Sequence, residues 1–173
     1  QAQSIEGLHN WIETIRAFPK PVVAAVEGAC AGAGFSLALA CDLVVAAQNS
    51  VFVMSYSSVG LSPDGGATWS LMRALPRATA LQLLLLGERV GAQRLQELGL
   101  VSQVSASGEA LPDALALCDR LNARAPNALA SIKELANDAH QVSLHAQLAS
   151  ERDHFVRNLH HGNAGEGISA FIE

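Results

Sequence analysis

Hydrophobic positions up to Val53 switch between a helical pattern and short continuous apolar runs. Ile5, Leu8, Ile12 and Ile15 recur at helical spacing, and the prolines that follow end this predicted helix. The run Val22–Val26 is too continuous for a half-exposed strand, so it predicts a buried strand of a parallel or covered sheet. Beyond it the pattern predicts a glycine-rich turn at Gly28–Gly34, a short helix at Phe35–Ala40, and strands at Leu43–Ala47 and Val51–Val53.

The rest of the chain is predicted to be mostly helical. After a turn-rich segment at Gly60–Gly66, the pattern predicts helices at Ala67–Ala74, Ala78–Leu86 and Ala92–Leu98 and a last strand at Val101–Val104. Further helices are expected along Leu111–Leu121, from Pro126, and along Leu144–Leu159, and Asn163 with Glu166 forms a capping pair for one more. The strands are therefore expected in the first part of the chain and most of the helices after them.

Composition narrows the class of protein. Half of the residues are hydrophobic and 16% are charged, which excludes a disordered chain. A net charge of −5 with eleven Lys and Arg residues argues against a nucleic-acid partner. The longest apolar stretch, Gly28–Cys41, is shorter than the roughly 20 residues that span a bilayer, so no membrane association is expected. Cys30, Cys41 and Cys118 lie in apolar surroundings and indicate reduced thiols in a cytoplasmic protein.

The glycine-rich turn is the first candidate for chemistry. Gly28–Gly34 lacks the Gly-Lys-Ser/Thr of a phosphate-binding loop, and Leu37 stands where a dinucleotide fingerprint needs its third glycine. A tight turn between a strand and a helix directs backbone N–H groups outward, which suits an oxyanion hole. Close packing of the helix on the sheet is the alternative explanation. Ser36 lacks the flanking glycines of a serine-hydrolase elbow.

Asp64 is the second candidate. It lies in the segment Ser62–Gly66 before a predicted helix, where it serves either as a turn or capping residue or as a catalytic carboxylate. His140, His145 and His154 fall on polar helix faces. His160–His161 end a helix and have no acidic or histidine partner four residues on, so no metal site is expected.

Together these segments resemble the crotonase superfamily of acyl-CoA hydratases and isomerases. The resemblance covers the whole chain and rests on the following stretches: Pro19–Gly28, GAGFSLALACD (Gly32–Asp42), VGLSPDGGATW (Val59–Trp69), Leu86–Arg89 with Gly99–Val101, and GEGISAFIE (Gly165–Glu173). The glycine-rich turn and the Pro-Asp-Gly-Gly segment are most similar to the enoyl-CoA isomerase type of phenylacetate degradation.

The resemblance implies a fold and an assembly. It implies an α/β fold, with a spiral of ββα turns over residues 1–107 and a helical trimerisation region over residues 108–173. The N-terminal part of the domain is expected to be missing from this chain. It also implies an acyl-CoA thioester substrate, no cofactor other than the coenzyme A of that substrate, and a homotrimer or a dimer of trimers.

The resemblance further implies roles for particular residues. The Ala33 amide, flanked by Gly32 and Gly34, falls on the position of one of two oxyanion-hole donors, the other preceding Gln1. Ser36 and Tyr56 stand where hydratases carry two glutamates, and neither is a competent base near neutral pH, so both are expected to contact the substrate as pocket residues. Asp64 falls on the carboxylate that shuttles a proton in the isomerases. Three apolar side chains are expected to line the substrate pocket: Val59, Leu61 and Trp69.

Three activities and one non-catalytic role are compatible with this resemblance. A double-bond isomerase with Asp64 as its acid and base is favoured, because a single carboxylate suffices for a 1,3 proton shift. A hydratase is the first alternative, although both glutamates are replaced. An aryl-CoA dehalogenase, in which an Asp near this position attacks the ring, has no other support. The last alternative is a truncated, non-catalytic family member that only assembles.

Overall fold

The computed structural model of the protein describes residues 2–165, which divide into two compact units. The first unit contains the residues up to Phe18 together with Val22–Asp119, and the second contains Pro19–Pro21 and the residues from Arg120 onward. The first unit holds the strands together with helices and the second is helical, so the predicted α/β class is confirmed. The predicted functional division between residues 107 and 108 stays a prediction.

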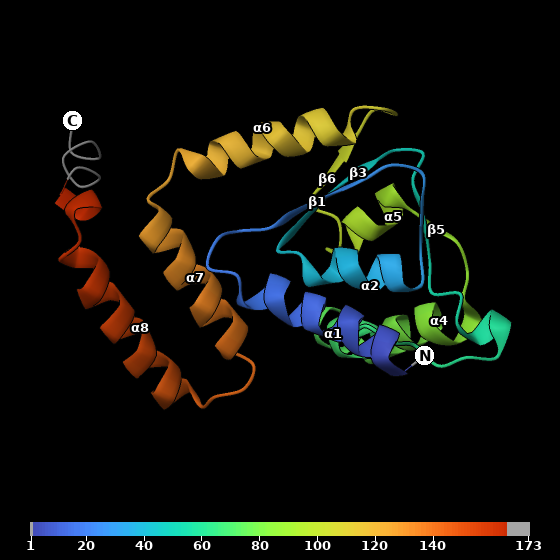
Figure 1. Cartoon of the computed structure of the whole chain (residues 1–173), viewed down its shortest axis with the longest axis horizontal. Helices are drawn as coiled ribbons and strands as arrows, with labels where there is room; N and C mark the ends of the chain where they lie inside the picture. Colours follow the sequence, from blue (N-terminus) through green and yellow to red (C-terminus); the bar gives the residue numbers. More distant parts are fainter. Residues whose placement is uncertain (1, 166–173) are drawn as a thin grey trace. The chain divides into compact units, whose positions relative to one another are not determined.

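The strands of the first unit form two three-stranded sheets (Figure 1). One sheet has the order β1-β3-β6, with β1 at Val23–Val26, β3 at Leu43–Ala47 and β6 at Gln103–Ser105, and both of its pairings are parallel. The other has the order β2-β4-β5: β2 (Ala29–Ala31) pairs in parallel with β4 (Val51–Val53), and β4 pairs antiparallel with β5 (Val90–Gly91).

The chain passes from one sheet to the other twice in succession. β1 leads into β2 and then into the helix α2 (Ala33–Ala40), and after α2 the chain enters β3 and then β4. Each turn therefore adds one strand to each sheet. This is the ββα spiral implied by the crotonase resemblance, and that expectation is confirmed.

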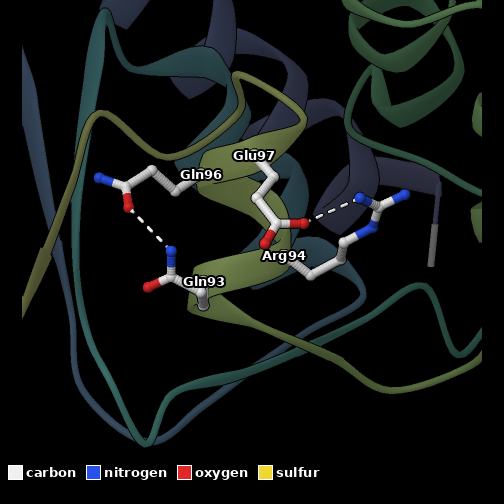
Figure 2. Close-up of polar contacts among 4 residues, drawn as sticks. All are labelled: Gln93, Arg94, Gln96 and Glu97. Carbon is white, nitrogen blue, oxygen red and sulfur yellow. Dashed lines mark hydrogen bonds and ion pairs between the residues drawn. The ribbon is translucent and has the colours of Figure 1, made fainter.

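Helices surround these sheets in the first unit. They are α1 (Ala2–Ala17), α3 (Ala67–Ala74), α4 (Arg77–Leu86), α5 (Ala92–Glu97) and most of α6 (Ala110–Asn122), which continues into the second unit from Arg120, with a 3₁₀ turn, η1, at Ser57–Val59. Side chains three residues apart pair on the exposed face of α5: Gln93 donates to Gln96, and Arg94 forms an ion pair of 2.9 Å with Glu97 (Figure 2). Such exposed pairs contribute little to stability, so buried contacts must hold α5 in place.

The core of the first unit is built from small and medium apolar side chains. Val45, Ala46, Leu71 and Leu95 are fully buried, and the rings of Phe35 and Phe52 stack at 5.1 Å in a tilted arrangement. The abundant buried alanines allow helices to approach the sheets closely. Burial also raises the pKa of the Cys30 thiol to about 11, which keeps it protonated.

The second unit contains α7 (Pro126–Asp138) and α8 (Leu144–Leu159), which pack against each other. Ser143 caps α8 by accepting a hydrogen bond from the Ala146 amide. Asparagine side chains join the two helices: Asn127 donates to Asn158, which donates to Ser131. The predicted capping pair Asn163–Glu166 and the closing stretch Gly165–Glu173 extend outside the described residues.

Two short strands were not predicted from the sequence. β2 lies inside the segment predicted as a glycine-rich turn, and β5 follows α4 where no strand was expected. Two or three residues are too few to produce a periodic pattern, and both strands form because β4 offers them a partner. The last strand begins at Gln103 rather than Val101. Among residues 2–165, no helix is long and apolar enough to cross a membrane.

Candidate active site

The N-terminus of α2 forms the first part of the candidate site. Gly32 has φ +51° and a buried position, and its N–H donates to the Val53 carbonyl at 2.9 Å. This conformation favours glycine and turns the chain from β2 directly into the helix. Ala33 and Gly34 follow as exposed residues of the first helical turn, where N–H groups have no intrahelical acceptor. The partial positive charge of this helix end suits an oxyanion.

Ser36 lies one turn further along α2 and is 1% exposed. Its hydroxyl lies within hydrogen-bond distance of two backbone carbonyls, that of Gly32 at 3.3 Å and that of Asp64 at 3.1 Å. The bond to Asp64 joins α2 to a loop 28 residues away in the chain. Ser36 therefore stabilises the Asp64 loop through its backbone.

Asp64 is half-buried and does not cap a helix. The N-cap of α3 is Gly66, which makes no side-chain capping bond, and the Ala67 amide donates to the Asp64 main-chain carbonyl at 3.3 Å. The carboxylate instead accepts a hydrogen bond from the Tyr56 hydroxyl at 2.5 Å, through its Oδ1 atom. The capping alternative raised for this residue is therefore wrong.

Tyr56 immediately precedes η1 and is 9% exposed. Burial raises the pKa of its phenol, and the hydrogen bond and negative charge of Asp64 raise it further. The phenol also lies beside Gly32: a Cβ built at Gly32 would be 3.7 Å from the Tyr56 hydroxyl oxygen. Tyr56 thus lies next to both the start of α2 and Asp64.

The three apolar residues expected to line the substrate pocket are Val59, Leu61 and Trp69. Val59 and Leu61 are 67% and 65% exposed, on and just after η1. The Trp69 ring is flanked by two guanidinium groups, with Arg16 at 4.3 Å and Arg73 at 4.0 Å from its centroid. The Trp69 ring is therefore already in contact with two cations, an arrangement that nothing in the local sequence indicated.

A cavity of about 600 Å³ lies along α2, from Gly34 to the C-cap residue Cys41. Small and apolar residues of β1, β2 and α2 make up most of its lining, including Ala24, Cys30, Ala31, Gly34 and Leu37. Asp64 is not among the lining residues. Among the described residues, no group of three His, Cys, Asp or Glu side chains could hold a metal ion.

The packing of α1 on this site was not predicted from the sequence. A Cβ built at Gly65 would lie 3.1 Å from Cδ1 of Ile12 and 3.3 Å from Cδ2 of Leu8. Both residues belong to the apolar face that predicted α1. The periodicity predicted that this face packs against the protein, and Leu8 and Ile12 are half-buried, but the residue that they contact could come only from the tertiary structure.

A two-sheet ββα spiral with a helix N-terminus facing a carboxylate loop is typical of acyl-CoA enzymes of the crotonase type. The model of the enoyl-CoA hydratase/isomerase family matches residues 1–173, so the chain belongs to this family. The resemblance drawn from the sequence motifs is confirmed.

Relatives within the family carry different activities. The chain is 40% identical over 171 residues to 1,2-epoxyphenylacetyl-CoA isomerase of Escherichia coli K12, covering 98% of this chain and 65% of that protein. It is 39% identical over 159 residues to 2,3-dehydroadipyl-CoA hydratase of the same organism, covering 92% and 62%. The chain thus spans slightly less than two thirds of the length of these relatives.

A solved structure is more similar still. The crystal structure of an enoyl-CoA hydratase from Polaromonas sp. JS666 superposes with a TM-score of 0.98 at 72% identity, over 99% of this chain and 67% of that one. The fold is therefore that of a crotonase-type enzyme. The comparisons leave open which reaction the site performs, because hydratases and an isomerase are both among the relatives.

Proposed function

We propose that this site shifts a double bond in an enoyl-CoA thioester, with Asp64 as the single proton carrier. The observation that carries the proposal is the environment of Asp64. Its carboxylate is linked through Tyr56 to the N-terminus of α2, and the two residues at the positions of the hydratase glutamates, Ser36 and Tyr56, both form hydrogen bonds with Asp64. One carboxylate is enough for a proton to leave one carbon and return to another.

The proposed reaction conserves atoms and charge. Asp64 takes the proton from the carbon next to the thioester carbonyl, and the electron pair of that C–H bond moves into the thioester to form a dienolate. The protonated Asp64 then returns the proton two carbons further along, and the double bond has moved by one position. The exposed Ala33 amide, at the positive end of α2, supplies one hydrogen bond to the developing oxyanion.

The variant Asp64→Asn tests this mechanism, because an amide is nearly isosteric but cannot accept the proton. In the purified protein with a 3-enoyl-CoA substrate, we expect kcat to fall by about 10²–10⁴ with KM little changed. Ser36→Ala should cost much less, since its hydroxyl carries no proton in this mechanism and its contacts with the Gly32 and Asp64 carbonyls only hold the loop in place. An Asp64→Asn protein that isomerises at the wild-type rate would rule the mechanism out.

Hydration of a 2-enoyl-CoA is the second candidate. Two similar proteins, the 2,3-dehydroadipyl-CoA hydratase and the Polaromonas enoyl-CoA hydratase, carry that activity in their names. Against it, water must be deprotonated while the neighbouring carbon is protonated, and Ser36 and Tyr56 are poor groups for those two steps. Measured hydration that persists in Asp64→Asn would favour this candidate.

Other expectations derived from the resemblance stay proposals. They are an acyl-CoA thioester as substrate, no cofactor beyond its coenzyme A, a homotrimer or dimer of trimers, and a cytoplasmic location. Gly32, Gly34, Val59, Leu61 and Trp69 are retained as proposed substrate contacts. Of these, Trp69 is proposed to contact the substrate beside the two arginines that lie near its ring.

A further inference from the structure

We propose that Tyr56 is a positioning residue: it holds Oδ1 of Asp64 so that Oδ2 is the oxygen that carries the proton. This inference rests on the proposed function of Asp64 and assigns Tyr56 a role other than a substrate contact.

Three hydrogen-bond donors around Asp64, one to its carboxylate and two to its main-chain carbonyl, support this assignment. The Tyr56 hydroxyl donates to Oδ1 at 2.5 Å, while the Ser36 hydroxyl and the Ala67 amide both donate to the main-chain carbonyl of Asp64. Oδ2 accepts no hydrogen bond from any residue between 2 and 165 for which the structure gives contacts. The main chain of Asp64 and its Oδ1 atom are therefore held by hydrogen bonds, whereas Oδ2 is left to accept the reacting proton.

Tyr56 is itself well anchored. Its main-chain carbonyl accepts hydrogen bonds from the Val59 amide at 3.1 Å and the Leu61 amide at 2.9 Å, which close the η1 turn. Its ring is buried beside Gly32, where a Cβ would lie 3.6 Å from the Cζ atom. A phenol constrained in this way restricts the rotation of the carboxylate that it contacts.

The chemistry of a phenol fits positioning better than proton transfer. Burial and the neighbouring carboxylate raise the pKa of Tyr56, so it stays a hydrogen-bond donor at working pH and does not act as a base. A donor on Oδ1 orients Oδ2 while leaving that oxygen free to be protonated. Orientation of this kind matters because a misplacement of about 1 Å can reduce a rate by about 100-fold.

The kinetic test is Tyr56→Phe, which removes only the hydroxyl. We expect kcat for isomerisation to fall about 10- to 100-fold while KM is nearly unchanged, because substrate binding does not use the lost bond. Ser50→Ala is the matched control: it removes another buried hydroxyl, which donates to the Val26 carbonyl at 2.9 Å outside the site, and should lower the melting temperature without changing kcat. A Tyr56→Phe protein with lowered melting temperature and unchanged kcat would overturn the inference.

A second measurement does not depend on activity. Tyr56 is the single tyrosine of the chain, so its ¹³C-labelled phenol carbon can be assigned from the spectrum that disappears in Tyr56→Phe. In Asp64→Asn the pKa of Tyr56 should fall, because the charge that raises it has been removed. An unchanged Tyr56 titration would mean that the two groups do not interact in solution, and the inference would be wrong.

Two outcomes distinguish failure of the proposed function from failure of the positioning role of Tyr56. If Asp64→Asn keeps full isomerase activity, the proposed function fails. If Asp64→Asn is inactive but Tyr56→Phe has wild-type kcat, the proposed function stands and only the positioning role of Tyr56 fails.

Discussion

At residue 65 the backbone leaves no room for a side chain. Gly65 has φ +59°, and a Cβ there would lie 2.9 Å from the Cβ of Ser36, which is rigidly held inside α2. The nearest atoms of Ile12 and Leu8 are the ends of flexible side chains and could shift, whereas the Ser36 Cβ cannot. Gly65 therefore allows the loop that carries Asp64 to pack directly on α1 and α2.

Gly65→Ala should lower the stability of the protein more than Gly66→Ala does. We expect the free energy of unfolding to fall by about 2–5 kcal/mol, which combines about 1–2 kcal/mol for the left-handed backbone with about 1–3 kcal/mol for the steric clash. The displaced loop should also lower kcat. Urea unfolding and the isomerase assay measure the two effects.

Gly66→Ala is the matched control for this prediction. Gly66 also has a left-handed backbone, with φ +74°, but a Cβ there would meet nothing within 4 Å. Only the backbone term of about 1–2 kcal/mol is expected. Equal losses of stability in both variants would show that the contact with Ser36 does not constrain the loop.

At the scale of elements, a residue from the end of β1 caps a helix far away in the chain. The Glu27 carboxylate accepts hydrogen bonds from the Ala110 amide at 2.8 Å and the Gly108 amide at 3.3 Å, at the start of α6. Amides at a helix N-terminus have no intrahelical acceptor, and a negative charge there also interacts well with the helix dipole. Glu27 thereby joins the first sheet to α6.

Glu27→Gln should lower the free energy of unfolding by about 1 kcal/mol, because one strong charge-assisted acceptor becomes a neutral one. Glu109→Gln serves as the control: Glu109 immediately precedes α6, and its carboxylate bonds to no other residue in the described part of the chain. It changes the charge at the same helix end without removing a hydrogen bond. Urea denaturation should give the larger loss for Glu27→Gln, and equal losses would contradict the capping role.

At the scale of the whole molecule, α8 presents an uncovered apolar face within the second unit. Leu144, Leu148, Phe155 and Leu159 share one side of this helix by their spacing, and they are 75%, 55%, 68% and 47% exposed. Exposed apolar side chains gathered on one helix face often mark a protein–protein interface. This supports the homotrimer or dimer of trimers proposed from the family resemblance.

The assembly can be disrupted at this face. Phe155→Glu should shift sedimentation velocity from a trimer or hexamer toward smaller species while the circular dichroism spectrum stays that of a folded protein. Arg157→Glu, which also alters charge on α8 but at a position pointing away from the apolar face, should leave assembly intact. A wild-type protein that sediments as a monomer would rule out the proposed assembly.

The local pattern of apolar and polar residues was sufficient to predict many helices and strands of this chain. The predicted bounds of Leu43–Ala47, Val51–Val53 and Ala67–Ala74 agree with β3, β4 and α3, because continuous apolar runs and flanking Gly or Pro residues are local signals. The motifs around Gly32 and Asp64 likewise identified the family, since each belongs to a short continuous segment.

Which of those segments pair and which side chains contact one another was decided by the tertiary structure. β2 exists because β4 offers it a partner, and Ser36 contacts Asp64 because α2 packs beside the loop before α3. The bond between Tyr56 and Asp64 spans the η1 turn, and no periodicity in the sequence reports which way either side chain points. Sequence alone thus identified the family and most of its elements, whereas the pairing of Tyr56 with Asp64 followed from how the elements pack, because hydrogen-bond partners are set by distance in space and not along the chain.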